Sequence, residues 1–302
     1  MALRTRTLGP LEVTVVGLGC NNFGGRVDEA GTRAVIDAAL DAGVTFFDTA
    51  DIYGNAGGSE TLIGKALEGR RERVVLATKF GKPMGDGASR RGSAPYVRAA
   101  IEASLGRLRT DHVDLYQHHE EDRETPLEET LGVISELVAE GKVRAFGTSN
   151  YAPQTLDRAA GIADTLGLPY VSEQSHYSWL DRGAERELLP ACERLGLGFI
   201  PFFPLASGLL TGKVSREQPP QPGTRLYGRE IDAERLDGVE ELRAWADDHG
   251  VSLLDVAVGG LAAVSPVASV IAGATRVEQV RANAAAGAWE PTADELAELI
   301  AL

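Results

Sequence analysis

The chain has 302 residues, of which 43% are hydrophobic, so it can bury a large core in one α/β barrel or in two smaller domains. Its formal net charge of −14 disfavours broad contact with the phosphates of a nucleic acid. Neither the first residues nor any later run has the apolar length of a signal peptide or of a membrane span, which predicts a cytoplasmic protein without membrane contact.

Short apolar runs alternate along the chain with amphipathic segments. Strands that are buried on both faces are expected to be continuously apolar. Seven runs fit this pattern: 44–48 (VTFFD), 74–79 (VVLATK), 113–119 (VDLYQHH), 143–149 (VRAFGTS), 170–174 (YVSEQ), 197–203 (LGFIPFF) and 268–273 (ASVIAG). An earlier apolar run, 13–19 (VTVVGLG), precedes them, and its role stays open.

The segments between these runs carry helix signals. In residues 125–141 (TPLEETLGVISELVAEG), Thr125 and Glu128 predict a capping box, with Pro126 at the first helical position and Gly141 at the C-terminus. Strands and helices that alternate without a linker predict a parallel sheet with right-handed crossovers. We therefore expect one domain that spans residues 1–302.

A doubly wound sheet and a closed barrel both fit this alternation. The early stretch VVGLGCNNFGG offers Gly17 and Gly19, but Asn22 stands where a dinucleotide-binding GxGxxG fingerprint needs its third glycine. About eight strand-helix steps over 302 residues match a (β/α)8 TIM barrel better.

Polar residues collect at the ends of the predicted strands, which is where active sites lie in a TIM barrel. They are Asp48 after VTFF, Lys79 after VVLAT, His119 after VDLYQH, Ser149 and Asn150 after VRAFGT, and Gln174 after YVSE. The stretch FFDTADIYG adds Asp51 and Tyr53 to the first of these ends. We interpret Asp51 as a loop cap or a solvated carboxylate.

Seven stretches resemble the aldo-keto reductases, which are (β/α)8 oxidoreductases that use NADP(H). They are GVTFFDTADIYGNAGGSE, ATKFG, VDLYQHHEED, TPLEETLGVISELVAEGKVRAFGTSN, EQSHYSWLDR, PFFPLASGLLTGK and IAGATRVEQVRAN, in the order of the family and over nearly the whole chain. The resemblance implies reduction of an aldehyde or ketone by NADPH. No metal site is expected, because Cys20 and Cys192 lie far apart and form no CxxC pair that would suggest one.

The resemblance makes Tyr53 the general acid, Lys79 its cationic neighbour, Asp48 the partner of Lys79 and His119 a donor that orients the substrate. An ammonium group near a phenol is expected to lower the phenol's pKa and so to help it transfer a proton near neutral pH. His118 precedes His119 and is expected to face the other side of the strand.

The resemblance also implies an NADP(H) site. Ser149, Asn150 and Gln174 are expected at the nicotinamide carboxamide, and Phe202 on the nicotinamide ring in place of the family's usual Tyr or Trp. Contacts with the pyrophosphate are expected from Leu205, Ser207 and Lys213, and contacts with the adenosine phosphate from Gly273, Arg276, Gln279 and Asn283. The family's usual proline is Ala272 here and its second basic residue is Thr275, which leaves the strength of the NADPH preference open.

The substrate is expected to be a small carbonyl compound or alcohol, bound between loops 20–26, 84–92 and 214–232. Phe23, Met84, Leu226 and Tyr227 are the apolar side chains expected there. Two alternatives stay open: a regulatory subunit that holds the cofactor with slow chemistry, and an NAD-dependent sugar dehydrogenase. The sequence leaves the oligomeric state open.

Overall fold

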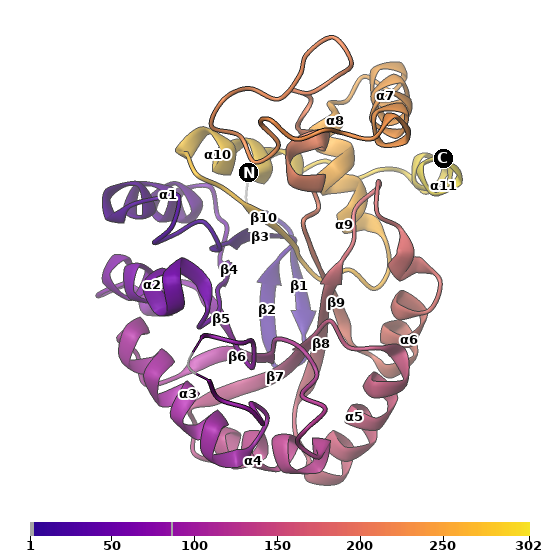
Figure 1. Cartoon of the computed structure of the whole chain (residues 1–302). Helices are drawn as coiled ribbons and strands as arrows, with labels where there is room; N and C mark the ends of the chain where they lie inside the picture. Colours follow the sequence, from indigo (N-terminus) through magenta and orange to yellow (C-terminus); the bar gives the residue numbers. More distant parts are fainter. Residues whose placement is uncertain (1–2, 86) are drawn as a thin grey trace.

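Eight parallel strands form a (β/α)8 barrel in a computed structural model that describes residues 3–85 and 87–302 (Figure 1). The strands follow one another around the barrel as β3 (Val16–Gly19), β4 (Phe46–Asp48), β5 (Val75–Phe80), β6 (Val113–His118), β7 (Val143–Ser149), β8 (Tyr170–His176), β9 (Gly198–Phe202) and β10 (Val270–Gly273). Between the last two strands, Phe199 donates to Pro266 O at 2.9 Å and Ala268 donates to Phe199 O at 2.7 Å. These bonds close the barrel.

A short antiparallel hairpin, β1 (Thr5–Leu8) and β2 (Leu11–Thr14), covers one end of the barrel (Figure 1). Its Leu8, Leu11 and Val13 are buried in an inner core formed with side chains of the barrel strands. The turn needs Gly9, because φ is +56° there and a Cβ atom would lie 2.2 Å from Val171 Cγ1. The hairpin thus leaves only the opposite end of the barrel available for a deep site.

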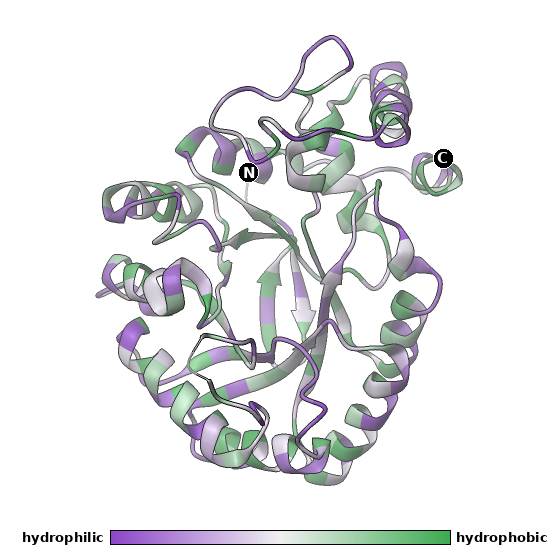
Figure 2. Cartoon of the chain, viewed as in Figure 1, coloured by the Kyte–Doolittle hydropathy of each residue, from purple (hydrophilic) through white to green (hydrophobic). Residues whose placement is uncertain are grey.

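The helices surround the barrel and bury their apolar sides against it (Figure 2). They are α1 (Glu29–Asp41), α2 (Tyr53–Ala66), α3 (Ala94–Leu108), α4 (Leu127–Ala139), α5 (Pro153–Leu166), α6 (Leu188–Leu195), α7 (Ala233–Asp248), α8 (Leu253–Asp255), α9 (Leu261–Ala263), α10 (Val277–Ala286) and α11 (Ala293–Ala301). A π-helical segment, Val256–Gly260, joins α8 to α9, and 3-10 turns lie at Arg71–Arg73, Gly183–Glu185 and Ala206–Thr211. Within the described residues, no helix combines the length and the apolar character needed to cross a membrane.

All seven predicted strands are present, with ends that differ by at most two residues. The run at 13–19 supplies the end of β2 and the whole of β3, with Val15 between them. The capping box predicted for α4 is wrong, because Pro126 is the N-cap residue and Thr125 Oγ1 donates to Asp122 Oδ2 at 2.6 Å instead. The Thr125 hydroxyl bonds the carboxylate of Asp122 in the preceding loop, so it does not cap the N-terminus of α4.

Candidate active site

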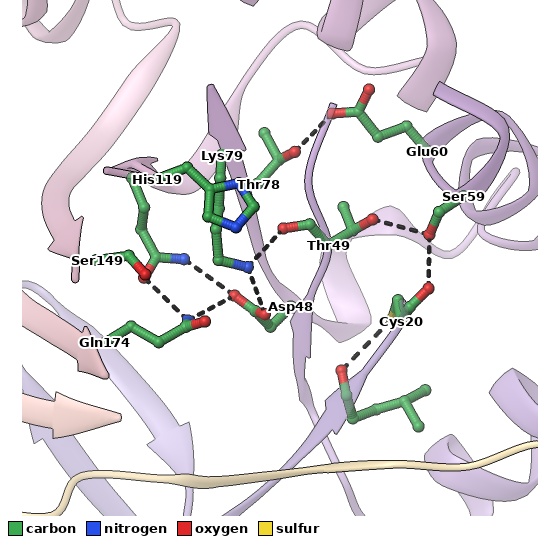
Figure 3. Close-up of polar contacts among 12 residues, drawn as sticks. Cys20, Asp48, Thr49, Ser59, Glu60, Thr78, Lys79, His119, Ser149 and Gln174 are labelled. Carbon is green, nitrogen blue, oxygen red and sulfur yellow. Dashed lines mark hydrogen bonds and ion pairs between the residues drawn. The ribbon is translucent and has the colours of Figure 1, made fainter. Parts of the chain in front are cut away.

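The predicted Asp48–Lys79 pair lies at the C-terminal ends of β4 and β5, inside the barrel (Figure 3). Lys79 Nζ donates to Asp48 Oδ2 at 2.6 Å and to Thr49 O at 2.9 Å. Lys79 is fully buried and Asp48 is 2% exposed. A buried ammonium is stable only when it is paired and hydrogen-bonded, and these two acceptors provide both conditions.

Tyr53 begins α2 beside this pair. Its ring centre lies 5.2 Å from Lys79 Nζ and 5.8 Å from the His119 ring, which meets it edge-on at 84°. The chain after Tyr53 turns sharply at Gly54, where φ is +68° and a Cβ atom would lie 2.5 Å from Phe23 O. The local fold thus gathers a phenol, an ammonium group and an imidazole around one point.

Burial sets the direction of the pKa shift of Tyr53, whereas charged and hydrogen-bonding partners set that of Lys79. Desolvation raises the pKa of the Tyr53 phenol above its ordinary value of 10.0, and the ammonium of Lys79 offsets only part of that rise. This net direction differs from the lowered pKa that we expected from the sequence. Desolvation is the largest influence on the pKa of Lys79 and lowers it, but Asp48 and Tyr53 together outweigh it and the net shift is upward. Lys79 is therefore protonated at neutral pH.

The two adjacent histidines face opposite sides of the barrel wall. His119 lines the cavity beside Tyr53, and burial together with the charge of Lys79 lowers its pKa to about 2. His118 is buried behind the wall, stacked on Phe80 at 4.8 Å and bonded through Nδ1 to the Tyr151 hydroxyl at 2.7 Å. His119 is therefore a neutral imidazole in the site, whereas His118 contributes to packing.

The three amide and hydroxyl residues predicted for the nicotinamide also lie at this end of the barrel. Asn150 adopts a left-handed conformation with φ of +60° and donates to His119 O at 3.0 Å and to Ser149 Oγ at 2.9 Å. Gln174 Nε2 donates to Asp48 Oδ1 at 3.0 Å (Figure 3). These contacts connect the predicted cofactor residues to the predicted catalytic residues.

A cavity of about 1520 Å³ opens at this end of the barrel. Most of the residues that the sequence singled out line it: Asp48, Tyr53, His119, Ser149, Asn150, Gln174, Phe202, Leu205, Ser207, Lys213, Leu226, Gly273, Arg276, Gln279 and Asn283. His176 stacks on Phe202 with ring centres 5.5 Å apart and planes 6° apart, which fixes the orientation of that ring. The structure thus brings together in one space the residues that were predicted from separate stretches.

Three of the four apolar residues expected at the substrate do not line the cavity. Phe23 is fully buried in the core between the barrel strands and the surrounding helices, where burial of an aromatic ring is more favourable than exposure. Tyr227 is 57% exposed, and Met84 is half-buried outside the cavity wall. Residue 86 of the expected loop 84–92 lies outside the described residues. Leu226 alone of this group reaches the cavity.

Cations that the sequence interpretation did not single out also line the cavity, namely Arg26, Lys82 and Arg225. Arg225 donates to Asn22 Oδ1 at 3.4 Å and lies 5.2 Å from the Phe203 ring, and no described carboxylate pairs with it. Burial and the neighbouring Arg26 lower the pKa of Arg225. The sequence shows Arg225 as one of three separated arginines in 214–232, but it does not show that this arginine lines the cavity at the barrel mouth.

Asp51 is not the solvated carboxylate that we expected. It is 1% exposed, and no side chain of the described residues bonds either of its oxygens. Burial, reinforced by the nearby carboxylate of Glu60, raises its pKa from the ordinary 3.8 to about 7. Arg107 opposes this shift without reversing it.

Because the pKa of Asp51 is higher in the folded state, the folded protein binds this proton more tightly than the unfolded chain does. The free energy of unfolding should therefore fall as the pH rises from about 4 to about 7. We expect Asp51→Asn to remove this penalty, on the order of 4 kcal/mol, so that the variant melts at a higher temperature than the parent at about pH 8 but not at about pH 4. Exposed Asp41 provides the control Asp41→Asn. Parallel melting curves for the parent and Asp51→Asn across this range would contradict the prediction.

The model of the aldo/keto reductase family matches residues 15–302. An uncharacterized oxidoreductase of Bacillus subtilis (strain 168), YrpG, is 42% identical over 287 residues, which cover 90% of this chain and 86% of the relative. A probable aldo-keto reductase 1 of Glycine max is 34% identical over 304 residues, which cover 95% of this chain and 85% of the relative. The barrel, the residues gathered at its mouth and these matches agree: the chain belongs to the aldo/keto reductase family and is an oxidoreductase.

Proposed function

We propose that the protein reduces an aldehyde or ketone to an alcohol with NADPH, and that Tyr53 is the general acid. The observation that carries this proposal is the buried Lys79–Asp48 pair, with its Nζ to Oδ2 distance of 2.6 Å, beside Tyr53 and His119 at the floor of a large cavity. A buried ion pair contributes little net stability, so its place beside a phenol and an imidazole at a cavity supports a role in chemistry on a bound molecule.

The charge of the cavity fits a dinucleotide phosphate. Five cations line it, namely Arg26, Lys82, Lys213, Arg225 and Arg276, whereas its only lining carboxylates among the described residues are Asp48, which Lys79 neutralises, and Glu278. The chain as a whole carries a formal charge of −14, so this concentration of positive charge is local. A low-dielectric cleft of one sign attracts and holds anions of the other sign.

The cavity residues divide into groups that suit the parts of NADP(H). Ser149, Asn150 and Gln174 would bond the nicotinamide carboxamide, and Phe202 would stack on the ring. Leu205, Ser207 and Lys213 would cover the pyrophosphate. Gly273, Arg276, Gln279 and Asn283 would hold the adenosine phosphate at the start of α10, where backbone N–H groups favour an anion. The cofactor, when bound, supplies the hydride.

The remaining steps belong to side chains of this chain. Tyr53 donates a proton to the carbonyl oxygen, and Lys79 stabilises the phenolate that remains. The neutral His119 orients that oxygen, and the two donors together stabilise the negative charge that develops on it. Leu226 contributes an apolar wall on the side of the loop 214–232.

An assay with 4-nitrobenzaldehyde tests this function. Purified protein with excess NADPH and aldehyde is expected to give many turnovers, followed by absorbance of the reduced nicotinamide. A single turnover would instead favour the regulatory subunit that holds the cofactor. Faster reaction with NAD and an aldose would favour the sugar dehydrogenase.

Arg276 is expected to determine the preference for NADPH over NADH. A guanidinium group can bond the 2′-phosphate through two N–H groups, and a hydrogen bond to a charged group contributes about 1.5–3 kcal/mol, which corresponds to roughly tenfold to a hundredfold. Arg276→Ala should therefore reduce the ratio of kcat/KM for NADPH to that for NADH by this factor. Arg281→Ala, at an exposed position farther along α10, is the control. An unchanged ratio in Arg276→Ala would show that this residue does not contact the phosphate.

A further inference from the structure

Gln117 is fully buried, and its side chain lies inside the barrel. Leu115, two residues earlier on β6, packs in the inner core, so the alternation of a strand places Gln117 on the same face. The register pairs Gln117 with Lys79 on β5 and with Gly147 on β7. A Cβ atom on Gly147 would lie 3.2 Å from Gln117 Cγ and 2.3 Å from Ser172 Oγ, so glycine at this position leaves room for the glutamine.

The amide of Gln117 contacts the carboxylate that holds Lys79. Gln117 Nε2 donates to Asp48 Oδ1 at 2.9 Å, and Gln117 Oε1 accepts from Gln174 Nε2 at 3.1 Å. Gln174 Nε2 also donates to Asp48 Oδ1 at 3.0 Å. The two oxygens of Asp48 therefore have different tasks: Oδ1 accepts from two amides, and Oδ2 accepts from the ammonium of Lys79.

Only one orientation of the Gln117 amide satisfies this network. An ionised carboxylate accepts hydrogen bonds and donates none, so the NH₂ group of Gln117 must face Asp48. The opposite orientation would place the amide oxygen against Asp48 Oδ1 and leave that oxygen with Gln174 as its only donor. A donor in this position holds the Asp48 carboxylate in one rotation and stabilises its negative charge.

We propose that Gln117 is a positioning residue for the reaction of the site: it holds the Asp48 carboxylate in the rotation that fixes the Lys79 ammonium beside the Tyr53 hydroxyl. This role rests on the proposed function. Gln117 is absent from the residues that line the cavity, and its side-chain contacts with residues of the site are the bond to Asp48 and the weaker, longer bond from Gln174.

Gln117 and Gln174 have different positions in the network. Gln174 lines the cavity and is proposed to bond the cofactor, so its amide would contact both Asp48 and the cofactor when the cofactor is bound. Gln117 is shielded from the cavity and keeps Asp48 as its hydrogen-bond acceptor throughout. It is therefore the constant donor to Asp48 Oδ1.

The test compares Gln117→Met, which keeps the length of the side chain and removes the amide, with Ser172→Ala as a matched control. Ser172 is buried on β8 against the same glycine, and its hydroxyl has no partner among the described residues. We expect kcat in Gln117→Met to fall roughly tenfold to a hundredfold, the range that corresponds to losing one hydrogen bond to a charged group. KM for the carbonyl and Kd for NADPH should change by less than about threefold, and Ser172→Ala should match the parent.

A double-mutant cycle shows whether the effect passes through Asp48. In an Asp48→Ala background, Gln117→Met should cause no further loss of kcat, and the unfolding free energies of the same four proteins should show coupling between the two positions. Gln117→Leu and Asp48→Asn provide a second cycle if the first pair does not fold. The inference fails if kcat in Gln117→Met stays near that of the parent, or if it falls equally when Asp48 is absent. Absence of turnover in the parent would instead contradict the proposed function, and the inference would fall with it.

Discussion

Tyr53→Phe is expected to lower kcat for carbonyl reduction by about 10²- to 10⁴-fold, because this is the range over which general acid catalysis contributes to a rate. The substitution removes one hydroxyl and keeps the ring that lies edge-on to His119 at 5.8 Å. The fold and the affinity for NADPH should therefore stay as in the parent. Single-turnover kinetics with aldehyde and a fluorescence titration with NADPH measure the two quantities separately.

The matched control is Tyr116→Phe. Tyr116 is fully buried on β6, and its hydroxyl has no hydrogen-bond partner among the described residues. Its ring stacks on Phe80, behind the barrel wall. We expect this variant to keep its turnover. If Tyr53→Phe reduced the aldehyde within about threefold of the parent rate, Tyr53 would not be the proton donor.

Lys79→Met is expected to lower kcat by about 10²-fold or more, since the site loses the charge that stabilises the phenolate. For reduction, Tyr53 must carry its proton, so activity falls as the pH rises through the pKa of its phenol. Burial already raises that pKa, and removal of the ammonium that opposes burial raises it further. The basic limb of the kcat profile should therefore move to higher pH. A basic limb that stays in place would mean that another group tunes the phenol.

Stability must be separated from chemistry in this experiment. Lys79→Met leaves the Asp48 carboxylate buried without its cation, and breaking a buried pair in this way costs about 3–5 kcal/mol. Asp48→Asn keeps a hydrogen-bonding group beside Lys79 and should lose less activity than Lys79→Met. The double variant Lys79→Met with Asp48→Asn has no unpaired charge, so it should regain stability without regaining turnover. Recovery of both would show that Lys79 acts only through the fold.

Much of the site was accessible from the sequence because a parallel barrel ends all its strands at one face. Asp48, Lys79 and His119 each follow an apolar run, so the strand pattern alone predicted that they would meet. Strand alternation likewise separated His119 from His118. The family followed from seven ordered stretches, and the matches over residues 15–302 confirm it.

Other features were decided by tertiary packing. Whether Asp51 is exposed to solvent or buried depends on segments that come later in the chain and pack around it. Phe23 could have faced either the cavity or the core, and the local sequence does not decide between them. The net direction of the Tyr53 pKa depends on how much water burial removes, which no local pattern reveals.

The sequence by itself determined the order of strands and helices and the residue types at the strand ends, because apolar periodicity and capping are local properties of the chain. Only the tertiary structure decided which polar atoms meet. The bond from Gln117 to Asp48 joins residues that are 69 positions apart, and the bond from Gln174 to Asp48 joins residues 126 apart. Such contacts depend on the register and closure of the barrel, which place side chains from distant strands within hydrogen-bonding distance.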